Sequence, residues 1–330
     1  EMPLLLTDSE VNSVMDMNDC IIVMEDLLDQ AARGRTWSQH RTHIRTPVGF
    51  HHVMPGALFD TKVVGVKIYT ARFPGGSRFI TVLHDSETGD LLALLQGGRC
   101  SQLRTGALTG VATKQMARED SSIVGIIGTG VQARAQLEGV CAVRDIRQVR
   151  TFDILPERSQ QFAEEMTALL GVEVQASQSP EECVAGADII VTMTTAPAPV
   201  LFGKWLEAGM HINACGANAW TRREIDDEVI KRSGTVVVDS IEEAKRYSGD
   251  LLFPIESGAV RWEEVNELWE VTSGRVSGRN NNEGTGFAIC RNNQFVATCF
   301  SGGCRHGCTC GNGHEKTKEM KNGKWLHTQR

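Results

Sequence analysis

One short segment constrains this chain more than any other: an apolar run, Ile123–Ile127, that leads directly into a glycine-rich turn. The turn consists of Gly128, Thr129, Gly130, Val131, Gln132 and Ala133, which fit the pattern G-x-G-x-x-A. In dinucleotide-binding turns the first glycine permits a tight bend, the second lets a pyrophosphate approach the backbone, and the small third residue lets helix pack on strand. The helix N-terminus adds free N–H groups that favour phosphate. The segment predicts a dinucleotide site, with an ordinary tight turn as the alternative.

The residues after Ser122 alternate between short apolar runs and helical stretches. We expect strands at 123–127, 148–152, 189–193, 211–214 and 235–238, with helices between them. Such alternation indicates a parallel sheet with crossover helices. The predicted fold class is therefore α/β, with a Rossmann-type doubly wound parallel sheet over residues 119–289.

Asp153 ends the second expected strand, 25 residues after Gly128. A carboxylate at this position accepts hydrogen bonds from the adenosine ribose and repels a 2′-phosphate. NAD is therefore the expected cofactor. Two alternatives stay open: Arg158 could receive the phosphate of NADP, or Asp153 could merely cap the following turn.

The first 118 residues have a different pattern, which predicts an α+β domain. Thr7 and Glu10 have the spacing of a capping box, and apolar residues recur at helical spacing over 18–33. Apolar or β-branched runs at 63–69, 79–83 and 91–95 predict strands, the last two joined as a hairpin through the turn 85–90. Residues 101–119 predict a helix with small residues on one face.

Composition excludes several functions. Hydrophobic residues make up 41% and charged residues 23%, as in ordinary globular proteins, and the net charge is −7. That charge gives no broad positive field for nucleic acid or anionic lipid. No apolar run reaches the roughly 18 to 20 residues that span a bilayer, and the N-terminus lacks a signal-peptide pattern. We expect a cytoplasmic protein without nucleic-acid or membrane partners.

The cysteines fall into two groups. Cys20, Cys100, Cys141, Cys183 and Cys215 are scattered among apolar neighbours and indicate small buried side chains in a reducing compartment. The other five crowd into residues 290–310, in a tail without apolar periodicity. Because their spacing contains no C-x-x-C pair, we expect an altered terminus rather than a metal site. Residues 315–325 predict a short charged helix.

With these residues in hand, the chain resembles the ornithine cyclodeaminase/mu-crystallin family from about Leu4 to Gly278. The glycine turn carries part of the likeness. The remaining motifs are Met54-Pro55-Gly56, Gly65-Val66-Lys67, Phe73-Pro74-Gly75-Gly76, Leu103-Arg104-Thr105-Gly106-Ala107 and Asn213-Ala214-Cys215-Gly216-Ala217-Asn218. The resemblance implies a homodimer, with substrate binding and dimerisation in residues 1–118, completed by 290–330, and NAD binding in 119–289.

The resemblance also implies roles for individual residues. Arg41 and Arg104 would clamp a substrate carboxylate, for which the guanidinium fork is suited. Lys67 would stand beside the reacting carbon and nitrogen, where neighbouring positive charge lets an amine exchange protons. Thr105 and Thr194 are further cofactor-binding candidates. Surface salt bridges are the alternative interpretation of the arginines and the lysine.

Asn218 departs from the family cyclodeaminases, which carry an aspartate at this place. An amide cannot exchange a proton near neutral pH, although it can hydrogen-bond an amine or the nicotinamide amide. We therefore expect an NAD-dependent reductase or dehydrogenase that transfers hydride between nicotinamide and the Cα of a small imino or amino acid, with Lys67 and Asn218 as catalytic residues. Ornithine cyclodeaminase is one alternative, and a non-catalytic mu-crystallin-like binding protein is the other.

Overall fold

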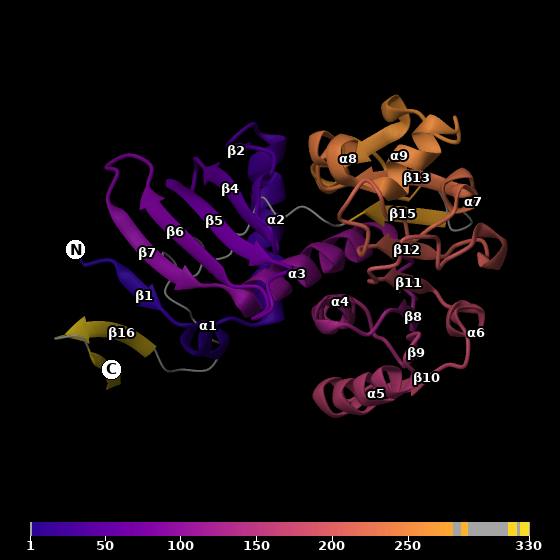
Figure 1. Ribbon diagram of the computed structural model, residues 1–330, viewed down its shortest axis with the longest axis horizontal. Helices are drawn as coiled ribbons and strands as arrows, with labels where there is room; N and C mark the ends of the chain where they lie inside the picture. The colour runs from indigo at the N-terminus through magenta and orange to yellow at the C-terminus, as the bar shows by residue number, and fades with distance from the viewer. Residues whose placement is uncertain (1, 280–284, 290–315, 322–323, 330) are drawn as a thin grey trace.

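Two β-sheets, connected by a long helix that runs between them, organise the chain (Figure 1). The computed structural model describes residues 2–279, 285–289, 316–321 and 324–329. The first sheet is mixed, with strand order β1-β7-β6-β5-β4-β2 and β3 paired to β4. Its strands are β1 (Leu4–Leu6), β2 (Thr36–Ser38), β3 (Thr42–Arg45), β4 (Phe50–Leu58), β5 (Val63–Ala71), β6 (Phe79–Asp85) and β7 (Leu91–Gln96). Since β6 and β7 pair antiparallel, the predicted hairpin is confirmed.

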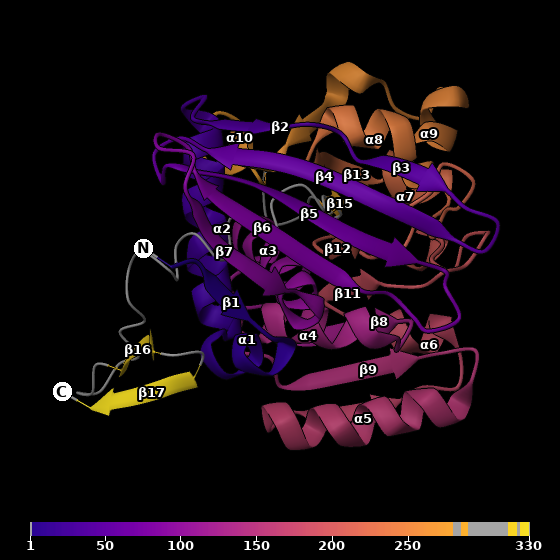
Figure 2. The same cartoon turned by 60° about the vertical axis from the view of Figure 1, so that its left-hand side comes forward.

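Three helices, α1 (Asp8–Val14), α2 (Met17–Ala32) and α3 (Gly98–Met116), lie on one face of this sheet. Figure 2 looks onto the opposite face, which no described helix covers. The capping box of Thr7 and Glu10 begins α1 as predicted. Helix α3 begins at Gly98, three residues before its predicted start, because Asp8 Oδ1 accepts a hydrogen bond from Gly98 N at 2.8 Å. None of the described helices is long and apolar enough to cross a bilayer.

The second sheet is parallel throughout, with strand order β10-β9-β8-β11-β12-β15-β13-β14. Its strands are β8 (Ile123–Ile127), β9 (Gln148–Phe152), β10 (Glu173–Ala176), β11 (Ile189–Thr192), β12 (His211–Ala214), β13 (Ser233–Val238), β14 (Val265–Glu267) and β15 (Thr285–Ile289). The α-helices are α4 (Val131–Cys141), α5 (Pro156–Leu170), α6 (Pro180–Val184), α7 (Asp227–Lys231), α8 (Ile241–Tyr247), α9 (Gly249–Glu256) and α10 (Leu268–Thr272), with 3-10 turns at Gly203–Trp205 and Trp262–Glu264. Helices lie on both faces (Figure 1), which confirms the doubly wound fold class.

Two expectations near the C-terminus are wrong. Residues 285–289 form β15, between β12 and β13, where no strand was predicted. The predicted helix over 315–325 is instead an antiparallel pair, β16 (Lys316–Lys321) and β17 (Lys324–Gln329). Asn322-Gly323, between those strands, is a strong sequence signal for a hairpin, and it outweighs the helical propensity of the flanking lysines. The cysteine-rich residues 299–310 lie outside the described part.

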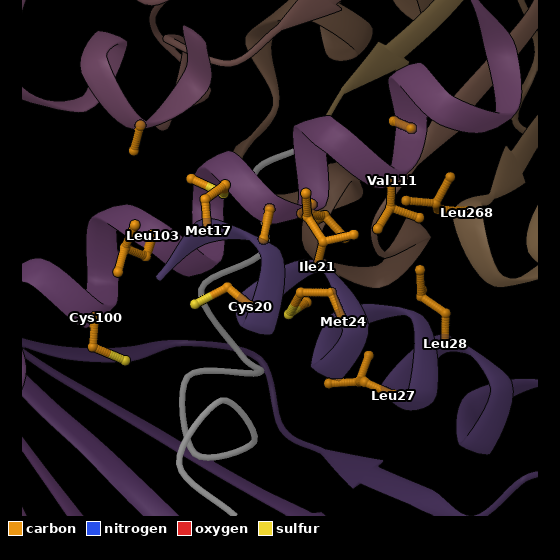
Figure 3. Close-up of a cluster of buried hydrophobic side chains, with 14 of the residues drawn as sticks. Met17, Cys20, Ile21, Met24, Leu27, Leu28, Cys100, Leu103, Val111 and Leu268 are labelled. Carbon is orange, nitrogen blue, oxygen red and sulfur yellow. The ribbon is translucent and has the colours of Figure 1, made fainter. Parts of the chain in front are cut away.

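Helices α2 and α3 share one apolar core with α10. Figure 3 shows side chains of α2 that include Met24 and Leu28, Val111 of α3 and Leu268 of α10 in this cluster. Cys20, Cys100, Cys183 and Cys215 are buried as predicted, whereas Cys141 is half-buried. Burial raises the pKa of Cys183 to about 12 and keeps its thiol protonated.

Helix α3 also crosses α4 at backbone contact. A Cβ built on Gly106 would lie 1.9 Å from the Ala135 carbonyl oxygen, and one on Gly139 would lie 2.0 Å from the Gly106 carbonyl oxygen. Because α3 continues from the mixed sheet and α4 follows the first parallel strand, this crossing fixes the two sheets relative to each other. The small face predicted for this helix is therefore the face that meets α4.

Candidate functional site

The glycine turn joins β8 to α4, where the strand order of the parallel sheet reverses. Ligands of doubly wound sheets bind in the crevice at this point. Gly128 has φ +94°, and a Cβ there would lie 2.5 Å from the Met193 carbonyl oxygen, so only glycine fits. Ala133 is fully buried in the apolar cluster between α4 and the sheet. Both observations agree with the roles predicted for the first and third positions.

The N-terminus of α4 offers room for an anion. Gly130 is the N-cap residue, no side chain caps the helix, and a Cβ on Gly130 would meet nothing within 4 Å. Beside it, Gln132 Oε1 is buried and has no hydrogen-bond partner in the described part of the chain. A buried polar atom without a partner costs about 1–3 kcal/mol, which a donor on a ligand would recover. The open N-terminus of α4 therefore fits the phosphates of a dinucleotide, and the Gln132 oxygen fits a hydrogen-bond donor elsewhere on the same ligand.

Asp153 lies just past the end of β9 and contacts the turn directly. Its Oδ2 accepts hydrogen bonds from Thr129 N and Thr129 Oγ1, both at 3.0 Å. Its Oδ1 accepts a hydrogen bond from Leu155 N at 3.1 Å, which is the capping contact of the alternative interpretation. Asp153 therefore holds the glycine turn in addition to standing where a ribose is expected.

Opposite the turn, the helix-facing side of the mixed sheet carries an aromatic row. His52, Tyr69 and Phe79 are directly paired neighbours on β4, β5 and β6. Ring centroids lie 4.4 Å apart for His52 and Tyr69, and 5.3 Å apart for Tyr69 and Phe79, with nearly parallel planes. Cross-strand aromatic pairs of this kind stabilise a sheet and hold each other in place. We call these three residues the aromatic wall.

Lys67 belongs to the next row of the same face and is only 2% exposed. Its Nζ donates to Ser101 Oγ on α3 at 2.8 Å and lies 4.9 Å and 5.2 Å from the ring centroids of Tyr69 and Phe79. The hydrogen bond and the two ring faces offset part of the cost of burying an ammonium group. The surface alternative for Lys67 is therefore wrong.

A cavity of about 320 Å³ lies between Tyr69 and Phe79 of the aromatic wall, α3 and the turn. Of the predicted site residues, it is lined by Lys67, Arg104, Thr105, Gly130, Val131, Gln132, Thr194 and Asn218. Gly128, Thr129, Ala133 and Asp153 are not part of this lining; they build and support the turn. Segments that are far apart in sequence are thus brought to one cavity.

The two arginines predicted as a clamp occupy different positions. Arg104 is buried on α3 and lines the cavity. Arg41 is also buried but lies at the rim, where Nη1 donates to Tyr69 Oη and Nη2 donates to the Asn218 carbonyl oxygen, both at 3.3 Å. Its guanidinium also lies 4.5 Å from the ring centroid of Tyr247. Arg41 therefore links the aromatic wall to the loop that carries Asn218.

Positive charge and burial together set the state of His52. Burial, followed by the nearby Arg41 guanidinium, lowers the pKa of His52 to about 4. The imidazole is therefore neutral at physiological pH, and it continues the aromatic wall without adding a third positive charge beside Lys67 and Arg41.

Several cavity residues were not predicted as site residues. Tyr69 could have been found, because it stands two positions after Lys67 on one strand and therefore shares its face. Phe79 requires the register between β5 and β6, and Ser101 requires the packing of α3. Gly216, which lies within a quoted motif, also lines the cavity.

Comparisons with known proteins find matches over most of the chain. The model of the ornithine cyclodeaminase/mu-crystallin family matches residues 1–288. A Delta(1)-pyrroline-2-carboxylate reductase of Bacillus cereus is 34% identical in an alignment of 294 positions that covers 85% of this chain and 89% of the relative.

Two solved structures share the whole fold. The Thermococcus litoralis Delta(1)-pyrroline-2-carboxylate reductase in complex with NADH and L-proline has a TM-score of 0.86 and 34% identity, covering 92% of this chain and 98% of that one. An archaeal alanine dehydrogenase dimer with bound NAD has a TM-score of 0.84 and 28% identity, covering 92% of this chain and 94% of that one.

Proposed function

This chain belongs to the ornithine cyclodeaminase/mu-crystallin family, and on that premise we propose that it is an NAD-dependent reductase or dehydrogenase of a small imino or amino acid. One observation carries the proposal: two buried cations, Lys67 and Arg104, line the same cavity as the N-terminal turn of α4. An anionic substrate and a dinucleotide would therefore meet within it. The relatives that bind NADH with L-proline, or NAD, support this assignment.

Substrate binding falls to Arg104 in this proposal. Its planar guanidinium matches a carboxylate and, being buried, acts where water screens little. Arg41 supports the site from the rim, because its contacts to Tyr69 and to the Asn218 carbonyl oxygen hold wall and loop together. Cofactor binding falls to the glycine turn, with Asp153 at the ribose and Thr105 and Thr194 at the cavity.

Lys67 is the residue best placed to move a proton. When bound, the nicotinamide would supply the hydride to the substrate Cα or accept it from there. Reduction of a C=N bond also needs one proton on the nitrogen, and Lys67 Nζ projects from the sheet toward the cavity that Arg104 lines. Its hydrogen bond to Ser101 Oγ and the adjacent ring faces fix the position of Nζ.

Asn218 favours a reductase over a cyclodeaminase. It lines the cavity with an exposed side chain, but an amide cannot serve as the acid or base that loss of ammonia and ring closure require. Asn218 can instead hydrogen-bond the substrate nitrogen or the nicotinamide amide. Reduction of a preformed imine requires less acid–base catalysis than cyclodeamination, because only one proton has to be delivered to the nitrogen.

We also propose a homodimer formed through the uncovered face of the mixed sheet. Two paired rows of this face are apolar, Val53, Ile68 and Ile80 in one and Val66, Val82 and Leu94 in the other. Ile80 is 43% exposed. A contiguous apolar sheet face marks an interaction surface, and the archaeal alanine dehydrogenase that shares this fold is a dimer. Residues 1–118 would then bind substrate and form the dimer, completed by 290–330, while 119–289 bind NAD.

The proposed function is tested by NADH oxidation with Delta(1)-pyrroline-2-carboxylate, and with pyruvate plus ammonia, the matched acyclic case. We expect net NADH consumption with at least one of these substrates and a clear preference for NADH over NADPH. Tight NADH binding without turnover across a panel of cyclic and acyclic imino acids would instead support a non-catalytic binding protein.

A further inference from the structure

We propose that Glu224 is a positioning residue that ties together the two loops forming one side of the nicotinamide site. The loops are residues 193–195, after β11, and residues 215–218, after β12, and both contribute to the cavity. This inference rests on the proposed function, because it assumes that the nicotinamide lies against these loops.

Three donors converge on the Glu224 carboxylate, one from Thr192 at the end of β11 and one from each loop. Oε1 accepts a hydrogen bond from Thr194 N at 2.5 Å. Oε2 accepts hydrogen bonds from Thr192 Oγ1, at 2.9 Å, and from Gly216 N. Each oxygen therefore holds a backbone N–H of a different loop, so that the carboxylate acts as a bridge between them.

Gly216 is required by this bridge. A Cβ built on Gly216 would lie 2.0 Å from Glu224 Oε1 and 2.2 Å from the carboxyl carbon. The loop backbone therefore passes directly over the carboxylate, and no larger residue fits between them. The glycine that stands two residues before Asn218 is thus explained by a contact with a side chain eight positions away.

Glu224 is itself held from behind. Its backbone N and that of Ile225 both donate to Asp250 Oδ1, at 2.6 Å and 3.2 Å, and its carbonyl oxygen accepts hydrogen bonds from Val200 N and Leu201 N at 2.7 Å and 2.9 Å. Glu224 and Asp250 are both fully buried. The bridge is therefore anchored to α9 through Asp250.

Glu224 does not belong to the cavity lining, whereas Thr194, Gly216 and Asn218 do. It therefore acts through the loops rather than on substrate or cofactor. A carboxylate accepts on both oxygens, but a glutamine accepts on only one and places an NH₂ group against the other backbone donor. Glu224→Gln keeps the shape of the side chain and must release either Thr194 N or Gly216 N.

The test compares Glu224→Gln with Glu228→Gln, which makes the same chemical change at an exposed position of α7 outside the cavity lining. We measure the NADH Kd by fluorescence, kcat and KM for the imino acid, and the primary isotope effect with NADH deuterated at C4. For Glu224→Gln we expect the NADH Kd to rise about tenfold, which is about 1.4 kcal/mol, and the isotope effect to increase, while the imino-acid KM changes by less than about threefold. Glu228→Gln should stay within about twofold of the natural protein in every quantity.

A folded Glu224→Gln protein with unchanged NADH Kd and isotope effect would overturn the proposal. If this variant does not fold, Glu224→Asp replaces it, because the shorter carboxylate cannot reach both loops. The same changes in NADH Kd and isotope effect are then expected of Glu224→Asp. Failure of the natural protein to bind NADH would instead overturn the proposed function. The two results are therefore distinguishable.

Discussion

The glycine turn after β8 and the aromatic wall of the mixed sheet face the same cavity, but they are built in different ways. The turn is a continuous segment of chain whose geometry depends mainly on the backbone: Gly128 has φ +94°, and Gly130 begins α4 without a side-chain cap. The wall and Lys67 depend on strand register and on α3, and each group is fixed by a neighbour from another segment. One side of the cavity is thus formed by the backbone of a single turn, and the other by side chains from several segments. The crossing of α3 over α4 fixes the position of one side relative to the other.

The largest expected effect is a loss of stability when the two sides of the cavity are forced apart at the crossing of α3 and α4. Gly106→Ala would place a methyl group 1.9 Å from the Ala135 carbonyl oxygen, so α3 and α4 must move apart. We expect a loss of about 3 kcal/mol in the free energy of unfolding, measured by urea denaturation. Gly97→Ala, at the N-cap of the same helix, is the control, since the nearest atom to its Cβ would be Thr81 Oγ1 at 3.7 Å, an ordinary contact distance. Equal stability of both variants would show that the crossing tolerates separation.

The next largest effect is on substrate binding, which depends on the side of the cavity formed by side chains from several segments. Arg104→Lys keeps the charge but loses the fork, so kcat/KM should fall about 100-fold, mainly through KM. The NADH Kd should stay within about twofold, because the turn is untouched. Arg78→Lys, at an exposed position just before β6, is the control and should leave the kinetics unchanged. Unchanged kinetics of Arg104→Lys would remove this residue from the substrate site.

A smaller effect is expected on cofactor preference, which depends on the glycine turn and Asp153. Asp153→Ser should reduce the preference for NAD over NADP by about tenfold, because the carboxylate no longer repels a 2′-phosphate. Since Asp153 also accepts two hydrogen bonds from Thr129, Thr129→Val is measured in parallel: it loses the hydroxyl contact and keeps the charge. An equal loss of preference in both variants would assign the effect to the turn geometry instead. Equal affinities of the natural protein for NAD and NADP would contradict the prediction outright.

The smallest effect concerns pH and the aromatic wall. The pKa of His52 is about 4 in the folded protein and about 6.5 in the unfolded chain. As pH falls from 6.5 to 4, the unfolded chain binds a proton that the folded protein does not, so stability declines over this window and levels off below it. His52→Gln should reduce that decline by about 1 kcal/mol after allowance for solvent screening, as measured by denaturation at each pH. His84→Gln is the control, and an identical pH dependence of all three proteins would contradict the assignment.

What the sequence predicts follows the same division between local and assembled features. The strand Ile123–Ile127, its glycine turn and the alternation behind it are local patterns, and the structure confirms them. The start of α3 depends on Asp8, which is 90 residues away, and strand β15 acquires its place only by pairing with β12 and β13. Tyr69 could have been predicted from the sequence, because the two-residue period of a strand places it on the same face as Lys67. Glu224 could not have been predicted, because its proposed role depends on loops that meet only in the folded chain.

The central claim, that this enzyme reduces an imine rather than cyclising ornithine, is tested most directly through Asn218. The measurement compares ammonia release from ornithine with NADH consumption on Delta(1)-pyrroline-2-carboxylate, for the natural protein and for Asn218→Asp. A positioned acid or base contributes about 10² to 10⁴ in rate, and the amide of Asn218 cannot act as one. We predict NADH consumption with the imine and negligible ammonia release from ornithine by the natural protein. Rapid formation of ammonia and proline from ornithine by the natural protein, without net cofactor turnover, would contradict the account and assign it as a cyclodeaminase.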